Sequence, residues 1–160
     1  MSDEAVYPVT DHFRNKALID KETYESMYQR SIQDPESFWA EQAKRLDWMK
    51  PFSRVKDVSF ASNDVHIRWF EDGTLNAAAN CIDRHLEERS GQPAIIWEPD
   101  EESEDNRVIT YAELHEEVSR LANGLKSLGV KKGDIVTLYM PMVPEAAYAM
   151  LACARIGAIH

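Results

Sequence analysis

The sequence is poor in cysteine and glycine and has no long apolar run. The two cysteines, Cys81 and Cys153, lie far apart and form no Cys-x-x-Cys pair, so no disulfide framework is expected. No apolar stretch approaches the roughly 18 residues needed to span a bilayer. The acidic start, residues 1–4, lacks the apolar segment of a secretory signal. These absences favour a soluble protein of the cytoplasm.

Basic residues are also scarce, with 18 Lys and Arg against 28 Asp and Glu and a formal net charge of −10. Nucleic acids and anionic membranes bind clustered Lys and Arg, so neither partner is expected. The densest acidic run lies at residues 98–105. We interpret it as a solvated loop rather than a Ca²⁺ or Mg²⁺ site, because it lacks the glycine-centred ligand pattern of an EF-hand.

The usual signatures of phosphate binding and nucleophilic catalysis are missing as well. Gly124 and Gly129 have the first spacing of a phosphate-binding loop, but Val130 follows where that loop needs lysine. The sequence has no Gly-x-Gly-x-x-Gly, no Gly-x-Ser-x-Gly and no His-x-x-x-His. We therefore predict no catalytic, cofactor-binding or metal-binding residue within these 160 residues.

One cysteine and one histidine are close enough in the sequence to meet in the fold. Cys81 and His85 are four residues apart in a predicted helix and could form a nucleophile or half of a zinc site. Reactive cysteines need an electropositive, accessible setting, whereas Asp83, Glu87 and Glu88 lie close in the sequence. We favour the alternative, a buried structural cysteine beside a histidine at the edge of the core.

Residues 1–73 are polar, aromatic-rich and irregular. Asp20 is a predicted N-cap of one helix, and Asp34 with Pro35 predicts the start of another. Alternating apolar residues at 65–69 predict a short strand.

Residues 74–160 alternate helix and strand patterns, which predicts an α/β fold. Thr74 is a predicted cap of a helix that carries Ile82 inward, and Ala94 to Trp97 is a predicted strand. A second short strand is predicted at residues 108–109.

The clearest helix signal follows that second strand. Thr110 and Glu113 form the Thr-x-x-Glu pattern of a capping box. The apolar stripe behind it has spacings of three and four residues and packs, in our interpretation, against a sheet. Its members are Tyr111, Leu114, Val118, Leu121, Leu125 and Leu128.

The last segment has the pattern of a parallel βαβ crossover. Residues 135–140 predict a buried strand, Glu145 to Ile156 predict an alanine-rich helix, and Gly157 is its predicted C-terminal cap. Residues 158–160 then begin a further strand. Because the chain stops there, we expect the N-terminal piece of a longer protein, with a small natural domain as the alternative.

Several short sequence motifs are not explained by helix, strand or turn patterns alone, and they occur in a fixed order along the chain. They are residues 46–52, 67–70, 73–76, 80–85, 109–114, 132–134, 140–145 and 150–160. Together the series resembles the N-terminal region of AMP-forming acetyl-coenzyme A synthetases, of the adenylate-forming superfamily. The resemblance covers nearly the whole chain from about residue 7.

The resemblance implies an irregular helical N-terminal extension at residues 1–73, which wraps a large domain. It implies that residues 74–160 are the first βαβ portion of that domain. The full-length protein would ligate acetate to coenzyme A through an acetyl-adenylate, using ATP and Mg²⁺ and releasing AMP and pyrophosphate. The family's phosphate loop and catalytic lysine match no position here, so the resemblance implies a fragment that is inactive alone and binds none of these cofactors.

Two alternative functions stay open at this point. The same strings fit a propionate–CoA ligase of the same family, and a stand-alone binding or scaffold module without catalysis is also possible. The expected partners are the small-molecule substrates and the remainder of the same polypeptide. Self-association through an uncovered sheet edge is a further possibility.

Overall fold

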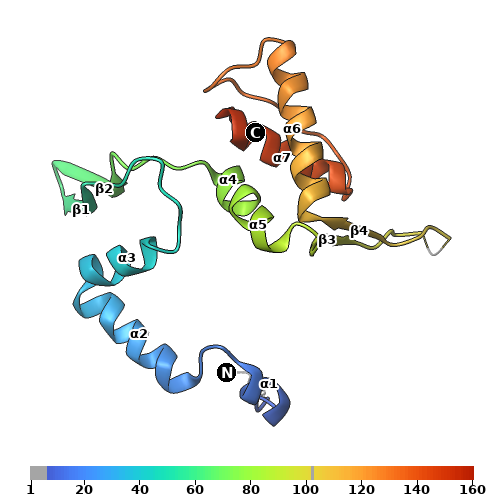
Figure 1. Cartoon of the computed structure of the whole chain (residues 1–160). Helices are drawn as coiled ribbons and strands as arrows, with labels where there is room; N and C mark the ends of the chain where they lie inside the picture. The colour runs from blue at the N-terminus through green and yellow to red at the C-terminus, as the bar shows by residue number, and fades with distance from the viewer. Residues whose placement is uncertain (1–6, 102) are drawn as a thin grey trace, which may run out of the picture.

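Three helices form an arm at the start of the structure, which is a computed structural model that describes residues 7–101 and 103–160. They are α1 (Asp11–Lys16), α2 (Lys21–Gln33) and α3 (Pro35–Ala43), and they lie apart from the C-terminal helices (Figure 1). Asp20 Oδ1 accepts a hydrogen bond from the Thr23 amide at 2.8 Å. Asp34 Oδ1 accepts one from the Ser37 amide at 3.2 Å. Both predicted helix starts are therefore confirmed.

A two-stranded antiparallel hairpin follows, made of β1 (Arg54–Ala61) and β2 (Asp64–Glu71). The strand predicted at residues 65–69 is confirmed within β2, but β1 was not predicted, because its apolar residues do not alternate regularly. Val58 pairs with Ile67 and Phe60 with Val65, so these four side chains share one face. The hairpin is thus amphipathic, and most of this apolar face is exposed.

An aromatic cluster packs where the hairpin joins the rest of the chain. The rings of Trp48, Phe52 and Phe70 lie 5.0–5.6 Å apart, centroid to centroid. Phe70 adopts a left-handed φ of 52°, which turns the chain back toward the cluster. Gly73 sits against it: a Cβ there would lie 2.7 Å from Cζ3 of Trp48 and 3.0 Å from Cβ of Phe52. The close approach requires glycine at this position.

Replacing Gly73 by alanine should therefore overpack the cluster and lower the free energy of unfolding by about 1–3 kcal/mol. Gly91→Ala is the matched control, because a Cβ at Gly91 meets no atom within 4 Å. That control should change stability by less than about 1 kcal/mol, in the stabilising direction. Urea denaturation of the two variants measures the difference, and equal effects would refute the packing argument.

The helix predicted from Thr74 is shorter and broken. Asn76, not Thr74, is the N-cap, because Asn76 Oδ1 accepts a hydrogen bond from the Ala79 amide at 3.1 Å. The segment forms α4 (Ala77–Cys81), a 3₁₀ turn η1 (Asp83–His85) and α5 (Leu86–Arg89). The break falls at Ile82, which leaves the helical conformation and is fully buried.

A second antiparallel pair, β3 (Pro93–Trp97) and β4 (Arg107–Thr110), leads into the long helix α6 (Tyr111–Ser127). Both strands and the capping box are confirmed: Glu113 accepts from the Thr110 amide at 2.8 Å, and Thr110 accepts from the Glu113 amide at 3.3 Å. The apolar stripe is only partly buried. Leu114 and Val118 are in the core, whereas Leu128 is 82% exposed because α6 ends before it.

The two ends of this stripe give a matched pair of leucines. Leu114→Ala should cost about 2–5 kcal/mol of unfolding free energy, because Leu114 is only 5% exposed. Leu128→Ala should cost less than about 0.5 kcal/mol. Thermal or denaturant unfolding measures both, and a large loss at Leu128 would mean that this side chain is covered in solution.

The last helix, α7 (Pro144–Ile156), is confirmed and ends at Gly157 with a left-handed φ of 76°. The strand predicted at residues 135–140 is wrong for the chain as described: only Ile135 pairs, in a parallel bridge with Ile159. A strand needs a neighbour along its length, and the segment from Ala158 supplies one bridge. The parallel direction agrees with a βαβ crossover.

The core lies between α6 and α7, where Figure 1 shows the two helices crossing. Its buried members are Ile82, Ile109, Leu114, Val118, Ala122, Tyr148 and Ala152. Small side chains on both helices let their backbones approach closely. Within the described ranges, no helix combines the length and apolar character required to cross a bilayer.

Candidate functional site

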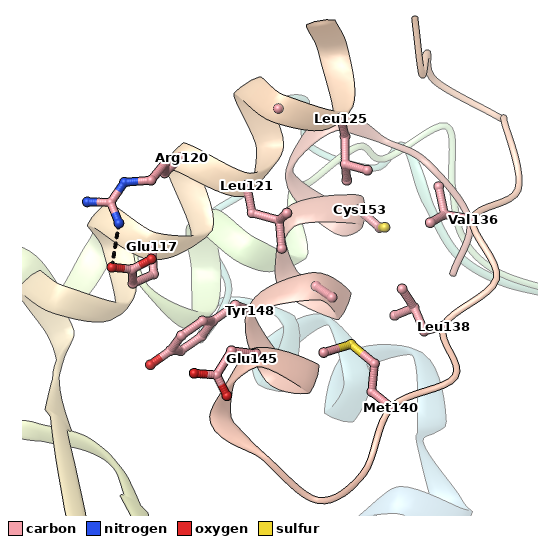
Figure 2. A pocket seen from close by; sticks show the side chains of 12 residues that line it. Glu117, Arg120, Leu121, Leu125, Val136, Leu138, Met140, Glu145, Tyr148 and Cys153 are labelled. Carbon is pink, nitrogen blue, oxygen red and sulfur yellow. Dashed lines mark hydrogen bonds and ion pairs between the residues drawn. The ribbon is translucent and has the colours of Figure 1, made fainter. Parts of the chain in front are cut away.

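An apolar groove of about 540 Å³ lies between α6, α7 and residues 136–140. Figure 2 shows the side chains of the extended segment turned toward those of the two helices. The apolar lining includes Leu121, Leu125, Val136, Leu138, Met140 and Cys153. We call this hollow the α6–α7 groove.

Charged side chains at the rim of the groove are already paired. Arg120 donates to Glu116 and Glu117, each at 2.7 Å, and Figure 2 shows the contact with Glu117. Glu145 accepts from Arg107 at 3.2 Å. A nucleotide phosphate needs cations or clustered amide donors that are free to meet it. The rim offers a neutralised edge instead, so the groove suits packing rather than phosphate binding.

Burial lowers the reactivity of two groups in the groove, the thiol of Cys153 and the hydroxyl of Tyr148, because it disfavours their ionised forms. Cys153 is completely buried, and this burial raises the pKa of its thiol. Burial also raises the pKa of Tyr148, helped by Glu145 and opposed by Arg107. Both groups therefore stay protonated at neutral pH, and a thiol is a poor nucleophile compared with a thiolate.

A polar network fastens the segment around η1 to the end of α7. Arg155 donates from both terminal nitrogens to Asp83, at 3.0 and 2.6 Å, and His115 Nε2 lies 3.5 Å from the same carboxylate. Partial burial opposes ionisation of Asp83, but the Arg155 guanidinium outweighs it and lowers the Asp83 pKa. Asn76 Nδ2 also donates to the Arg155 carbonyl at 2.9 Å. We call Asn76, Asp83, His115 and Arg155 the Asp83 network.

Asp83→Asn should lower the free energy of unfolding at neutral pH by about 1–2 kcal/mol, because Arg155, 21% exposed, loses its charged partner. The folded carboxyl has a depressed pKa, so its contribution is present above about pH 4 and is lost as the pH falls further. The difference between variant and parent should therefore shrink in acid.

Glu116→Gln is the control, because it breaks an exposed pair with Arg120. It should cost less than about 0.5 kcal/mol at any pH. Denaturant unfolding of both variants at neutral pH and at about pH 3 measures these differences. A loss in Asp83→Asn that is no greater than in the control would show that the network does not hold the fold.

The predicted neighbours Cys81 and His85 do not form a site. Because the helix breaks at Ile82, Cys81 ends α4 and His85 ends η1, so they do not share a helical face. Cys81 is exposed, and the expectation of a buried Cys81 is therefore wrong. The ring of His85 packs instead against Tyr111, with centroids 5.3 Å apart.

The other motifs weighed in the sequence have structural explanations. Gly124 lies inside α6, and Gly129 follows that helix with a left-handed φ of 93°, so the pair does not open a helix as a phosphate loop must. Residue 102 of the acidic run lies outside the described residues. Among the residues that are described, no three His, Cys, Asp or Glu side chains gather as a metal site would require.

Comparison with known proteins agrees with this geometry. Residues 24–81 match the family described as "Acetyl-coenzyme A synthetase N-terminus", and residues 82–160 match "AMP-binding enzyme". The chain superposes on a solved structure, the acetoacetyl-CoA synthetase from Streptomyces lividans, with a TM-score of 0.73 and 30% identity. That alignment covers 84% of this chain and 20% of the other. The architecture is thus that of the N-terminal part of an AMP-binding enzyme.

Closer relatives narrow the assignment. The chain is 64% identical to an acetyl-coenzyme A synthetase of Parvibaculum lavamentivorans over all of its 160 residues, and 61% identical to one of Novosphingobium aromaticivorans over 157 residues. It belongs to the acetyl-coenzyme A synthetase family. The chain spans 24% of the length of these relatives.

Proposed function

We propose that this chain is the N-terminal part of an AMP-forming acetate–CoA ligase. The observation that carries the proposal is 58–64% identity, over the whole chain, to proteins named acetyl-coenzyme A synthetase. In the proposed reaction, a carboxylate oxygen of acetate attacks the α-phosphate of ATP and pyrophosphate leaves. The thiolate of coenzyme A then attacks the acetyl carbon and AMP leaves, which gives acetyl-CoA.

We assign no step of that reaction to a residue of this chain. Transfer at a phosphate depends on cations that neutralise the developing charge. The groove's own arginine, Arg120, is held by two glutamates, and the described side chains form no carboxylate cluster for Mg²⁺. The ATP, Mg²⁺ and coenzyme A sites would thus come from the part of the relatives that this chain does not match.

The proposed role of the chain is to support that remainder. The parallel bridge between Ile135 and Ile159 gives the direction in which a longer strand would run beside residues 136–140. Such a strand would bring its own side chains over the α6–α7 groove. The exposed apolar face of the hairpin supports a second proposed contact, in which residues 1–73 form an extension that wraps the large domain begun by residues 74–160.

The remaining assignments follow from composition. We propose the cytoplasm as the compartment, because the two cysteines are unpaired and a reducing setting suits them. The net charge of −10 supports small-molecule partners over nucleic acid or an anionic membrane. Pairing of two copies through the free edge at residues 136–140 is the alternative to completion by the same polypeptide.

A chimera tests the proposal directly. Residues 1–160 would replace the matching segment of the Parvibaculum lavamentivorans protein, which is 64% identical there. The chimera should form AMP only when acetate, ATP and coenzyme A are all present, and the 160-residue chain alone should form none. Assays with propionate and acetoacetate in place of acetate would test the acyl preference.

Leu138→Asp in the chimera probes the supporting role. A carboxylate in the α6–α7 groove should abolish activity by preventing the covering strand from packing. Leu128→Asp is its control, because Leu128 is exposed at the end of α6. An inactive parent chimera that is folded would contradict the proposed function, and a fully active Leu138→Asp variant would contradict the role of the groove.

A further inference from the structure

A second hollow, of about 590 Å³, lies toward the C-terminal ends of α6 and α7. The chain turns back just after α6 (Figure 1), and the Gly133 amide donates to the Gly157 carbonyl at 2.9 Å, which holds this turn against the end of α7. Side chains of both helices and of the turn line the hollow. Its polar lining is made of Ser119, Asn123, Lys126, Lys131 and Arg155. We call it the helix-end pocket.

The charge of this lining is opposite to that of the whole chain. Lys126, Lys131 and Arg155 bring three cations, and among the residues that the structure describes no Asp or Glu belongs to the lining. The chain as a whole has a net charge of −10. A hollow lined by charge of one sign focuses the electrostatic potential and concentrates small ions of the opposite sign. The helix-end pocket therefore favours an anion.

The two lysines of the pocket are available to such an anion. Within residues 7–101 and 103–160, the lysine ion pairs involve Lys21 and Lys50, and neither Lys126 nor Lys131 takes part in one. The acid of the same turn, Asp134, directs Oδ2 to the Lys131 amide at 2.7 Å. This arrangement differs from the rim of the α6–α7 groove, where the cations are paired.

Arg155 adds a donor that no acceptor of the described chain meets. Its two terminal nitrogens donate to Asp83, so this carboxylate cancels the charge of the guanidinium and leaves that of the two lysines. Nε of Arg155 is buried and has no hydrogen-bond partner among the described residues. A buried N–H without an acceptor is unfavourable. An acceptor oxygen brought to this wall of the pocket would satisfy it.

The ends of the two helices offer a purely structural explanation for part of this charge. A helix C-terminus carries partial negative charge, so a lysine in the last turn stabilises the helix without any ligand. Lys126 lies in the last turn of α6, which ends at Ser127. The effect falls off within that turn, and Lys131 lies beyond it. The dipole of α6 therefore accounts for Lys126 but not for Lys131.

We propose that the helix-end pocket binds a phosphate group, as the free ion or as the phosphate of a small organic molecule. At neutral pH a phosphate ester carries about two negative charges, which matches the two unpaired lysines. Its oxygens accept hydrogen bonds, and Ser119 and Asn123 supply neutral donors beside the lysines. The volume is that of a small-molecule site, so an ester fits as well as the ion. The inference does not depend on the ligase activity proposed above.

A phosphate titration of the 160-residue chain, followed by amide NMR, tests the proposal. Sodium chloride keeps the ionic strength constant, because salt screens exposed charges. Saturable shifts should appear for the amides of residues 126–133 and 155–157, and not for those of the hairpin. Glycerol phosphate is the ester probe: binding of both probes identifies the phosphate group as the ligand, and binding of phosphate alone identifies the free ion. No saturable shift with either probe would overturn the proposal.

Variants assign the binding to the two lysines. Lys126→Gln and Lys131→Gln should each weaken it by about two- to five-fold, the range for loss of one exposed charged contact. Lys131→Arg, which keeps the charge, should retain most of the affinity. Lys21→Gln is the matched control, because this exposed lysine lies in α2 and should leave the affinity unchanged. Unchanged affinity in both pocket variants would also overturn the proposal, and the titration of the unaltered chain is independent of any variant's folding.

Discussion

The two hydrogen bonds from Arg155 to Asp83 are the contact on which the rest of this structure depends. They join the turn after α4 to the last turn of α7, and Asn76 adds a third bond to the same helix end. Ile82 lies beside Asp83 and is fully buried in the core between α6 and α7. The ion pair thus joins the segment that follows α4 to the end of α7, directly beside the apolar core.

The α6–α7 groove, with its paired rim charges, is suited to packing against another strand rather than to binding a phosphate. Its floor is apolar, its rim arginine is neutralised by two glutamates, and its cysteine is a buried thiol. Nothing in that arrangement would hold a triphosphate, which needs free positive charge. A covering strand with apolar side chains would fit it, and this agrees with a chain that matches about a quarter of its relatives' length.

Local signals in the sequence predicted most elements, and long-range contacts account for the errors. Caps such as Asp20 and the Thr110 capping box depend on neighbours three residues away, so the sequence alone located them. The prediction of Thr74 as an N-cap was wrong. Asn76 is also a good capping residue, and its side chain additionally donates a hydrogen bond to the Arg155 carbonyl of α7. The strand predicted at residues 135–140 is absent because a strand needs a neighbouring strand along its length, and only Ile135 has a pairing partner. The Asp83 network was missed because no spacing rule links residues 72 positions apart.

That separation also has a consequence for folding during synthesis. A ribosome adds about 5–20 residues per second, so Arg155 follows Asp83, 72 positions earlier, after roughly 4–14 s. Until then the arm, the hairpin and the aromatic cluster around Gly73 have emerged without their attachment to α7. The hairpin is held together during this interval by the pairing of its own two strands. The structure that forms before Arg155 is synthesised must therefore be stabilised by contacts among the preceding residues alone.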